Sequence, residues 1–293
     1  MQVAYLGPAG SFTELAARTL VGPGEELTPA ASVPTALAAV RSGAAGAAVV
    51  PLENSVEGVV PTTVDGLVRG GPLLITGEAL LRVTFALAAP PGATPATVRR
   101  VLTHPHAHSQ CRDWLARELP GAEFVPVGST SEAASAVARD ADPATAAVCA
   151  PATAERYGLD VLATDIGARR DAVTRFVRVA GADAVTPGPT GHDRTSVVLP
   201  LLDHVGALHR VLGAFARNGA NLTAINSRPT GDALGRYCFF LECDGHIADP
   251  AVFGAFTELR RHAPQALLLG SYPQAPNPVS VAGPAPAPLL ART

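Results

Sequence analysis

The sequence predicts an α/β protein followed by a smaller ferredoxin-like domain. Over the first 180 residues, short apolar runs alternate with stretches that begin at helix-capping residues, a pattern typical of a parallel or mixed sheet flanked by helices. From residue 194 the order becomes strand, helix, strand, strand, helix, strand, which is the ferredoxin-like arrangement. A chain of 293 residues, 47% of them hydrophobic, is long enough to form two domains with separate cores.

The first region supplies its elements in a regular order. An apolar strand ends at Gly7, and the helix expected at 11–20 has Ser11 three residues before Glu14, the spacing of a capping box. The same reasoning predicts helices at 34–43 and 129–140, strands at 44–50, 121–127 and 145–151, and a helix that runs into a strand at 96–104. In such sheets, ligands bind beyond the carboxyl ends of the strands.

Hydroxyl and amide side chains gather at the expected strand ends, in GPAGSFTE, PLENSVEG, THPHAHSQC, STSEAA and AVTRF. A single Ser or Thr there is more often a helix cap than a ligand contact. Together, five such clusters with helix N-termini and one arginine suit a small anion such as a carboxylate. No GxGxxG follows a strand and no GxxxxGKS/T occurs, so a nucleotide is not expected.

Charge and composition exclude several classes of partner. A formal charge of −3 and a pI near 6.2 provide no basic face for nucleic acid. No apolar stretch reaches the roughly 18 residues of a membrane span, and the start lacks a signal-peptide pattern. We therefore expect a cytoplasmic protein without membrane contact. Its four cysteines lack CxxC spacing and are expected to be reduced and buried.

Three histidines alternate in THPHAHSQC at positions 104, 106 and 108. On a strand they would share one face and could bind a metal. However, Thr103 is a plausible N-cap and Pro105 a first helical residue, which predicts a loop and a first helical turn instead. No carboxylate stands nearby in the sequence to complete a ligand set, so neither a metal nor another cofactor is expected.

The second region follows a Gly/Pro-rich linker at 181–193. Strands are expected at 194–202, 221–230, 236–243 and 266–270. Two helices between them each show one apolar face, formed by Leu208, Val211, Leu212 and Phe215 in the first and by Val252, Phe253, Phe256 and Leu259 in the second. The region spans 194–272, and the Pro/Ala-rich tail at 273–293 is predicted to be disordered.

In order, GPAGSFTE, PLENSVEG, THPHAHSQC and TRF, followed by GAL and SRPTGDALGRYCFF, resemble prephenate dehydratase with a carboxy-terminal ACT regulatory domain. The likeness runs from residue 3 to about 272. It implies a catalytic domain at 1–180 made of two α/β lobes, similar to type II periplasmic binding proteins, with the active site in the cleft between them. It also implies conversion of prephenate to phenylpyruvate, carbon dioxide and water in phenylalanine biosynthesis.

The resemblance further implies roles for individual residues. Thr174 of the TRF motif would be the essential hydroxyl donor, Arg175 would hold a carboxylate, and Phe176 would form a wall. Glu53 would act as an orienter or as a partner for Arg175. Motif matching adds catalytic Asn54, Thr103 and Gln110, and substrate-binding Ser11 and Ser55. Ser11 stands where the family commonly has Thr, a change that keeps the hydroxyl.

The ACT resemblance implies feedback inhibition by L-phenylalanine bound across a homodimer, alone or within a homotetramer. The implied effector-binding residues are Gly206, Ala207, Leu208, Asn221, Leu222, Asn226, Ser227, Arg228 and Pro229. The chain departs from the family at Asn226, usually Glu, and at His209, usually Val. Because all motifs for the chemistry precede the linker, a chain cut after about residue 185 is expected to keep turnover and lose the response to phenylalanine.

Two other functions remain open. An arogenate dehydratase would run the same elimination on a substrate that carries an amino group in its side chain, and no residue here separates the two substrates. A non-catalytic amino-acid sensor would need the cleft and the ACT domain but no hydroxyl donor, which the TRF motif argues against.

Overall fold

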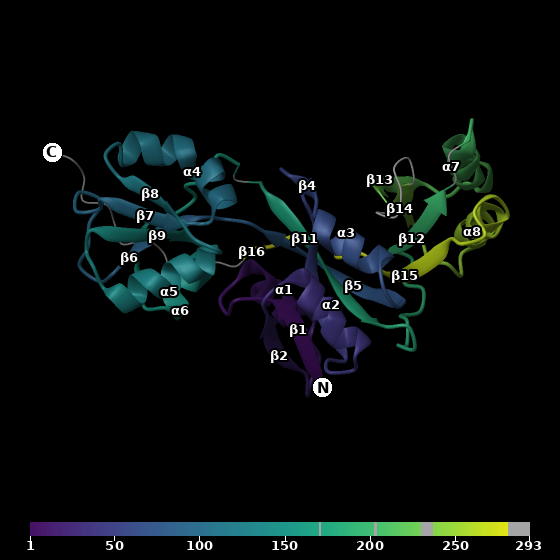
Figure 1. Cartoon of the computed structure of the whole chain (residues 1–293), viewed down its shortest axis with the longest axis horizontal. Coiled ribbons are helices and arrows are strands. Elements are labelled where there is room, and N and C mark those ends of the chain that lie inside the picture. The colour runs from purple at the N-terminus through teal and green to yellow at the C-terminus, as the bar shows by residue number, and fades with distance from the viewer. Residues whose placement is uncertain (170, 202–203, 230–236, 281–293) are drawn as a thin grey trace.

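The computed structural model describes residues 1–169, 171–201, 204–229 and 237–280. Three sheets organise these residues, with 7, 5 and 4 strands. Figure 1 shows the three sheets in a row, with the 7-stranded sheet in the middle, the 5-stranded sheet at the left and the 4-stranded sheet at the right. The predicted fold class, two α/β lobes plus a ferredoxin-like domain, is confirmed.

The first lobe is built on a sheet of order β16-β5-β11-β3-β1-β2, with β4 paired to β3. Its strands are β1 (Gln2–Leu6), β2 (Glu26–Ala30), β3 (Ala47–Asn54), β4 (Gly58–Val59), β5 (Leu73–Arg82), β11 (Val173–Gly181) and β16 (Val279–Ser280). Helix α1 (Phe12–Leu20) packs on one face, and α2 (Val33–Arg41) and α3 (Pro61–Val68) pack on the other. Strand β11 is central and runs antiparallel to both neighbours, β3 and β5.

The second lobe has strand order β10-β6-β9-β7-β8. Its strands are β6 (Ala86–Ala89), β7 (Arg100–Thr103), β8 (Glu123–Pro126), β9 (Thr145–Cys149) and β10 (Asp160–Ala163), and its helices are α4 (Pro105–Glu118), α5 (Thr130–Asp140) and α6 (Pro151–Arg156). Residues 95–97 form a turn and 98–99 are irregular, where the sequence predicted a helix. The cap of α4 is His104, one residue later than predicted, because the hydroxyl of Thr103 bonds the carbonyl of Val148 instead.

The chain crosses between the lobes twice, after β5 and before β11. The two crossing segments are hydrogen-bonded to each other, since Val83 N donates to the carbonyl of Ala172 at 2.8 Å and Ile166 N to that of Phe85 at 3.1 Å. The return of β11 to the first lobe places residues 173–181 beside residues 47–54. Two motifs that lie 120 positions apart in the sequence therefore meet in one sheet.

The carboxy-terminal domain, called the ACT domain after the resemblance described above, forms a 4-stranded antiparallel sheet of order β13-β14-β12-β15. Its elements are β12 (Asp193–Leu201), α7 (Ala207–Asn218), β13 (Leu222–Pro229), β14 (Tyr237–Asp244), α8 (Pro250–His262) and β15 (Leu267–Pro273). Both helices cover one face of the sheet through a core that includes Val211, Phe215, Val252 and Leu259. All four belong to the apolar faces that the sequence predicts; Val211 and Phe215 come from the first helix, and Val252 and Leu259 from the second.

The other face of the ACT sheet packs on the first lobe. Phe240, Leu269 and Tyr272 share one buried core with first-lobe residues such as Ile75 and Val177. At Gly270, with φ of 136°, a Cβ atom would lie 2.2 Å from the carbonyl oxygen of Ile75, so only glycine allows this approach of β15 to β5. The ACT domain is therefore packed into the first-lobe core, and a chain cut after about residue 185 would expose part of that core. That such a chain keeps turnover and loses the response to phenylalanine stays a prediction.

The carboxy-terminal tail differs from its prediction in part. Strand β16 pairs in parallel with β5, with Val279 opposite Leu81 and Ser280 opposite Arg82. Residues 274–280 thus return to the first lobe rather than being disordered, while 281–293 lie outside the described residues. All four cysteines are buried and free of disulfides, as expected. Within the described parts of the chain, no helix is long and apolar enough to cross a bilayer.

Candidate active site

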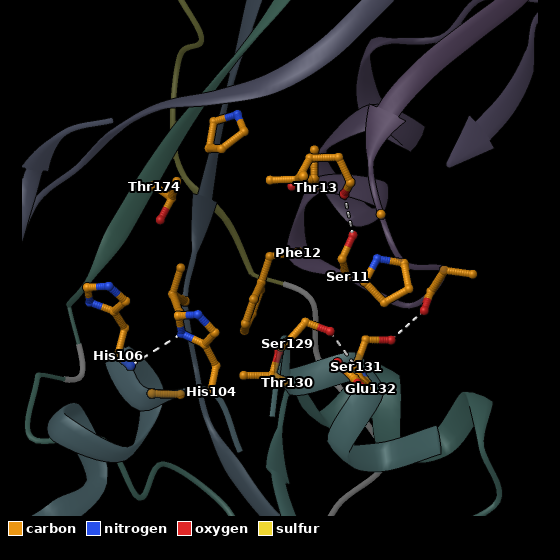
Figure 2. A pocket seen from close by; sticks show the side chains of 18 of the residues that line it. Ser11, Phe12, Thr13, His104, His106, Ser129, Thr130, Ser131, Glu132 and Thr174 are labelled. Carbon is orange, nitrogen blue, oxygen red and sulfur yellow. Dashed lines mark hydrogen bonds between the residues drawn. The ribbon is translucent and has the colours of Figure 1, made fainter. Parts of the chain in front are cut away.

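A cavity of about 1020 Å³ opens between the two lobes (Figure 2). It is lined from the first lobe by the loop at 6–9, the start of α1 and the paired ends of β3 and β11, and from the second lobe by the starts of α4 and α5. Among the described residues that line it there is no Lys or Arg. The polar lining consists of hydroxyl, amide and imidazole groups with the carboxylates Glu57 and Glu132.

Three helices begin at the cavity, and each has a side chain that caps its first turn. Ser11 accepts a hydrogen bond from Glu14 N at 3.3 Å at the start of α1, and Ser129 accepts one from Glu132 N at 3.0 Å at the start of α5. His104 Nδ1 accepts from His106 N at 3.3 Å at the start of α4. Helix N-termini carry partial positive charge, so this cavity attracts anions without a guanidinium.

Thr174 and Asn54 form a directly opposed pair of β11 and β3 on the cavity wall. Asn54 Nδ2 donates to Thr174 Oγ1 at 2.8 Å. The amide of Asn54 is held in this orientation because its oxygen accepts from Val56 N at 2.8 Å and Glu57 N at 3.1 Å. Since the Thr174 oxygen accepts the bond from Asn54, its own hydroxyl proton remains available to a ligand in the cavity.

Three more predicted residues lie at this cavity. Phe176 follows Thr174 on the same face of β11, Ser11 caps α1, and Gln110 reaches it from α4. An apolar surface for a ring is supplied by Phe12 and Phe85, whose rings meet edge to face with centroids 5.8 Å apart. The structure thus brings together Thr174, Asn54, Gln110, Ser11 and Phe176.

Arg175 is not at the cavity, which corrects its predicted contact with a substrate carboxylate. Side chains of a strand alternate between its two faces, so Arg175 points away from the face that carries Thr174 and Phe176. Its guanidinium lies between the first lobe and the ACT domain and contacts Glu53 at 3.1 Å and Glu78 at 3.2 Å. Of the two roles predicted for Glu53, the structure shows the partnership with Arg175.

Thr103 and Ser55 also lie away from the lining. Thr103 is fully buried, and its hydroxyl donates to the carbonyl of Val148 at 2.8 Å, joining two strands of the second lobe. The hydroxyl of Ser55 accepts from Val173 N at 3.0 Å, and Ser55 N donates to Val173 O at 2.8 Å. These contacts make Ser55 a support for the start of β11, the strand that carries Thr174.

Sequence reasoning missed the contacts that join the lobes across the cavity. Glu57 Oε1, in the turn after β3, lies 3.0 Å from His106 Nδ1 and accepts from Gln110 Nε2 at 3.3 Å. Burial holds the pKa of the neighbouring His104 below its usual value, which favours the neutral imidazole. Glu57 stands inside the quoted stretch PLENSVEG, but no local signal shows that it faces α4.

The loop that ends in Ser11 is held by the second lobe. Thr153 donates its hydroxyl proton to Gly10 O at 2.6 Å, Tyr157 donates to Ala9 O at 3.2 Å, and Ser131 also bonds the carbonyl of Ala9. These contacts fix the start of α1 relative to the starts of α4 and α5. The geometry of the three helix ends around the cavity is therefore set by polar contacts between the lobes.

The predicted effector-binding residues divide between two ends of the ACT sheet. Pro229 and the carboxyl end of β12 both pair with Tyr237, and Gly206, Ala207 and Leu208 begin α7 at this end. Asn221 and Leu222 lie at the other end, where Asn221 Nδ2 donates to Asp244 Oδ2 at 2.8 Å. A strand of about seven residues spans roughly 20 Å, so these residues do not form one site within a single chain.

Arg228 has a partner that its prediction does not include. Its guanidinium forms two hydrogen bonds with Asp65 of α3 in the first lobe, at 2.8 and 3.0 Å. These bonds hold the pKa of the Asp65 carboxyl below its ordinary value. Asn226 is opposite Phe240, whose side chain is in the core shared with the first lobe, so Asn226 lies on that face of the sheet.

A family model described as prephenate dehydratase matches residues 3–184, and one described as ACT domain matches residues 195–261. The chain belongs to the prephenate dehydratase family. A prephenate dehydratase of Amycolatopsis methanolica is 46% identical over 274 residues, which cover 94% of this chain and 89% of that relative. One of Mycobacterium tuberculosis is 42% identical over 285 residues, covering 94% and 88%.

Two solved structures are similar to this chain over nearly its whole length. A crystal structure of prephenate dehydratase from Arthrobacter aurescens in complex with L-Phe matches with a TM-score of 0.86 and 46% identity, covering 96% of this chain and 93% of that one. A structure of GqqA, described as a novel type of quorum quenching acylase, matches with a TM-score of 0.84 and 31% identity, covering 94% and 99%.

Proposed function

We propose that this chain converts prephenate to phenylpyruvate, carbon dioxide and water, with Thr174 as the proton donor to the leaving hydroxyl. The observation that carries the proposal is the contact between Asn54 and Thr174 on the cavity wall, 2.8 Å between Nδ2 and Oγ1. It orients the hydroxyl oxygen towards Asn54 and leaves the proton for a ligand. At 8% exposure, Thr174 makes this contact largely shielded from water.

The reaction requires help for a poor leaving group rather than a strong base. The carboxylate on the ring leaves as carbon dioxide, and its bonding electron pair moves into the ring and expels the hydroxyl from the opposite carbon. The hydroxyl takes the proton of Thr174 and departs as water, and Thr174 then recovers a proton from solvent. A positioned general acid contributes about 100- to 10,000-fold to such a step.

Both carboxylates of prephenate find suitable surroundings at the helix N-termini. Each of α1, α4 and α5 offers unpaired backbone N–H groups and about half a positive charge. The ring packs near Phe12, Phe85 and Phe176. Transfer of a carboxylate from water into this partly apolar cavity favours its loss as a neutral molecule. Gln110 supplies a hydrogen bond that fixes the orientation of the substrate. Ser11, whose hydroxyl donates to the carbonyl of Leu6 at 3.0 Å, holds the start of α1 in place.

The ACT domain is proposed to bind L-phenylalanine and to inhibit the dehydratase. Because the start of α7 and Asn221 stand at opposite ends of the ACT sheet, a site that uses both requires two copies of the chain. This placement supports the predicted homodimer, alone or within a homotetramer. The cytoplasm, where phenylalanine would be made from prephenate, stays the predicted location.

The test is to mix the purified full chain with prephenate and, separately, with arogenate, and to follow the aromatic product by absorbance. Faster formation of phenylpyruvate from prephenate is the expected result. Faster formation of phenylalanine from arogenate would make the chain an arogenate dehydratase. Binding of prephenate by calorimetry without turnover would instead favour the non-catalytic sensor.

A further inference from the structure

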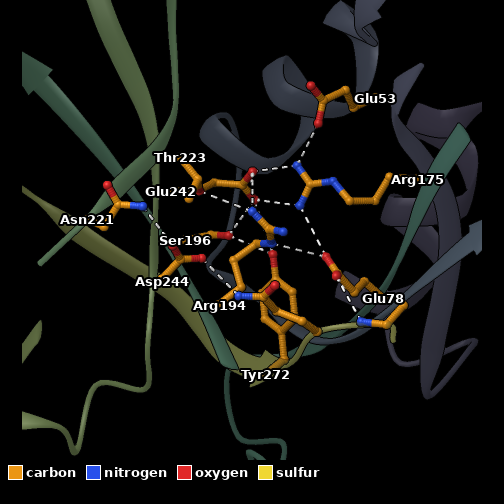
Figure 3. A network of polar contacts seen from close by, with 12 residues as sticks. Glu53, Glu78, Arg175, Arg194, Ser196, Asn221, Thr223, Glu242, Asp244 and Tyr272 are labelled. Carbon is orange, nitrogen blue, oxygen red and sulfur yellow. Dashed lines mark hydrogen bonds and ion pairs between the residues drawn. The ribbon is translucent and has the colours of Figure 1, made fainter. Parts of the chain in front are cut away.

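A buried ionic cluster joins the first lobe to the ACT domain on the side of the sheet away from the cavity (Figure 3). We call it the interdomain cluster and define it as Glu53, Glu78, Arg175, Arg194 and Glu242. The first three belong to the first lobe and the last two to the ACT domain. The side chain of Arg175 is 7% exposed, that of Glu78 1% and that of Glu242 0%.

Arg175 is the centre of the interdomain cluster. Its two terminal nitrogens bind both oxygens of Glu242 on β14, one of them at 3.0 Å. The same nitrogens contact Glu78 on β5 and Glu53 on β3. Burial alone would lower the pKa of Arg175, but the nearby carboxylates, Glu242 foremost, raise it, so the guanidinium stays charged.

Glu242 is tied to three strands of the ACT sheet. It stands on β14, and one of its oxygens accepts from Ser196 on β12 at 2.9 Å and from Tyr272 on β15 at 3.2 Å. Ser196 and Tyr272 are themselves 2.8 Å apart at their hydroxyl oxygens. The position of this carboxylate therefore follows the relative positions of β12, β14 and β15.

The strand register is irregular next to Thr174. Between β11 and β3, Arg175 is opposite Glu53 and Phe176 is opposite Pro51, so Leu52 is the extra residue of a bulge. Bulges interrupt the ladder, and near active sites they change the direction of a side chain. A displacement of Arg175 would thus act where the ladder between β11 and β3 is interrupted, one residue from the proposed proton donor, while the pairing of β11 with β5 is regular there.

Stability does not explain why charges are buried here. Desolvation of buried ion pairs offsets most of their attraction, and apolar residues of similar volume are often equally stable. The apolar core that Phe240 and Tyr272 share with the first lobe already holds the ACT sheet in place. The charged contact between Glu242 and Arg175, which follows Thr174 in the sequence, therefore requires another reason.

We propose that Arg175 is a positioning residue for Thr174, and that its contact with Glu242 transmits the effector state of the ACT domain to the active site. Movement of the ACT strands on phenylalanine binding shifts the Glu242 carboxylate. Arg175 follows it, and the bulge lets Thr174 leave the orientation set by Asn54. The inference rests on the proposed function, because it concerns how the same reaction is inhibited.

The experiment compares Glu242→Gln, Arg175→Lys and the double variant in full-length protein. The cluster has three carboxylates and two guanidinium groups, so Glu242→Gln balances its charges and is expected to fold. Arg175→Lys keeps the charge but cannot bind both oxygens of Glu242. Each single variant is expected to lower kcat, to change KM less than twofold and to weaken inhibition by phenylalanine about 2- to 30-fold. The double variant should lose no more than the larger single effect.

Arg178 and Glu25 provide the matched control. Arg178 lies on the same strand and binds both oxygens of Glu25, at 2.8 and 2.6 Å, but the pair does not involve the ACT domain. Arg178→Lys and Glu25→Gln are expected to reduce thermal stability and leave inhibition unchanged. Equal loss of inhibition in these controls, or unchanged inhibition in both cluster variants, would overturn the inference.

The same data separate failure of the inference from failure of the proposed function. If the natural chain turns over no prephenate, the proposed function fails and the inference falls with it. If the natural chain is active but phenylalanine does not inhibit it, the inference is wrong and the catalysis stands. Amide hydrogen exchange of residues 173–181, measured with and without phenylalanine, gives a readout independent of turnover. Exchange should change in the natural chain and stay constant in Glu242→Gln.

Discussion

The two faces of β11 near Thr174 carry opposite chemistry. On the cavity face, Thr174 meets an amide and helix N-termini, and none of the described lining residues is a Lys or Arg. On the other face, Arg175 meets the buried carboxylates of Glu78 and, from the ACT domain, Glu242, together with the partly exposed carboxylate of Glu53. The cavity thus offers the partial positive charges of helix N-termini and no guanidinium, while full positive charges lie where two domains meet.

This difference shows that the residues of one short motif can point to two different surfaces. The residues of TRF are consecutive, but strand geometry sends the first and third to the cavity and the second to the interdomain cluster. Glu53 and Asn54 are divided in the same way, because each is opposite its partner on β11. Three consecutive residues can therefore serve two surfaces at once.

The largest expected effect comes from removing the ACT domain, which uncovers the face of β11 that carries Arg175. A chain ending at residue 185 loses Phe240, Leu269 and Tyr272 from the shared core, together with β16. Exposing two aliphatic side chains of the first lobe, such as Ile75 and Val177, to water lowers the free energy of unfolding by about 3 kcal/mol or more. We expect the shortened chain to aggregate or to unfold at a much lower temperature, as measured by circular dichroism.

A chain cut after Ser280, which keeps all described contacts, is the control for that truncation. If the chain ending at residue 185 had the same melting temperature as this control, the ACT sheet would contribute nothing to the first lobe.

Thr174→Ala tests the cavity face alone. We expect kcat for prephenate to fall by about 100-fold or more, because the general acid is lost. Thr174→Ser keeps the hydroxyl and should retain most of the turnover. Both variants should show the circular dichroism spectrum of the natural chain. Near-normal activity of a folded alanine variant would remove Thr174 from the proposed mechanism.

Asp65→Asn tests a charged contact at the rim of the ACT interface. Arg228 holds the pKa of Asp65 below its ordinary 3.8, so the pair stabilises the fold above this pH and loses its effect as pH falls through the lowered pKa. Both side chains are partly exposed, so the expected loss is about 1 kcal/mol or less at pH 7. Urea unfolding from pH 7 down to below 3.8 should show the difference shrinking.

Asp140→Asn is the matched control for Asp65, because Asp140 pairs with its exposed sequence neighbour Arg139 and with no other charged side chain among the described residues. A difference at Asp65 that persisted at the lowest pH would show that its effect is not electrostatic.

Asn226→Glu is expected to have the smallest effect. Position 226 lies on the same face of β13 as Arg228, so a carboxylate there offers a charge to the ammonium group of phenylalanine or to Arg228. One partly exposed charge is worth about 1 kcal/mol or less, or up to about fivefold in Kd. Calorimetric titration with phenylalanine should show tighter binding by the variant, and equal or weaker binding would show that Asn226 does not limit affinity.

Local sequence signals predicted the parts of the fold that depend on neighbours in the chain. The caps of α1 and α5, the helical start at Pro105 and the order of elements in the ACT domain follow from spacing and capping residues. Family motifs then identified five residues that meet at the cavity. The caps are readable because each depends on a few consecutive residues, and the order of elements is readable because each element has its own local pattern.

The missing features depend on which distant surface a residue faces. Nothing near Arg175 shows that its side of β11 is covered by the ACT sheet, since that requires the position of Glu242, 67 residues later. The same holds for Glu57, which faces α4 at a separation of 49 residues from His106. Strand β16 was missed because two residues pairing in a Pro-rich tail leave no periodic pattern.

The absence of a guanidinium among the described residues of the cavity lining affects how the product leaves. Prephenate would enter with two carboxylates and engage more than one helix N-terminus, whereas phenylpyruvate retains only one. Each helix N-terminus stabilises a bound anion by about 0.3 to 1 kcal/mol when the site is exposed, and by more when it is partly buried. The chemical step itself would therefore remove part of what retains the ligand, so that the product is held less tightly than the substrate.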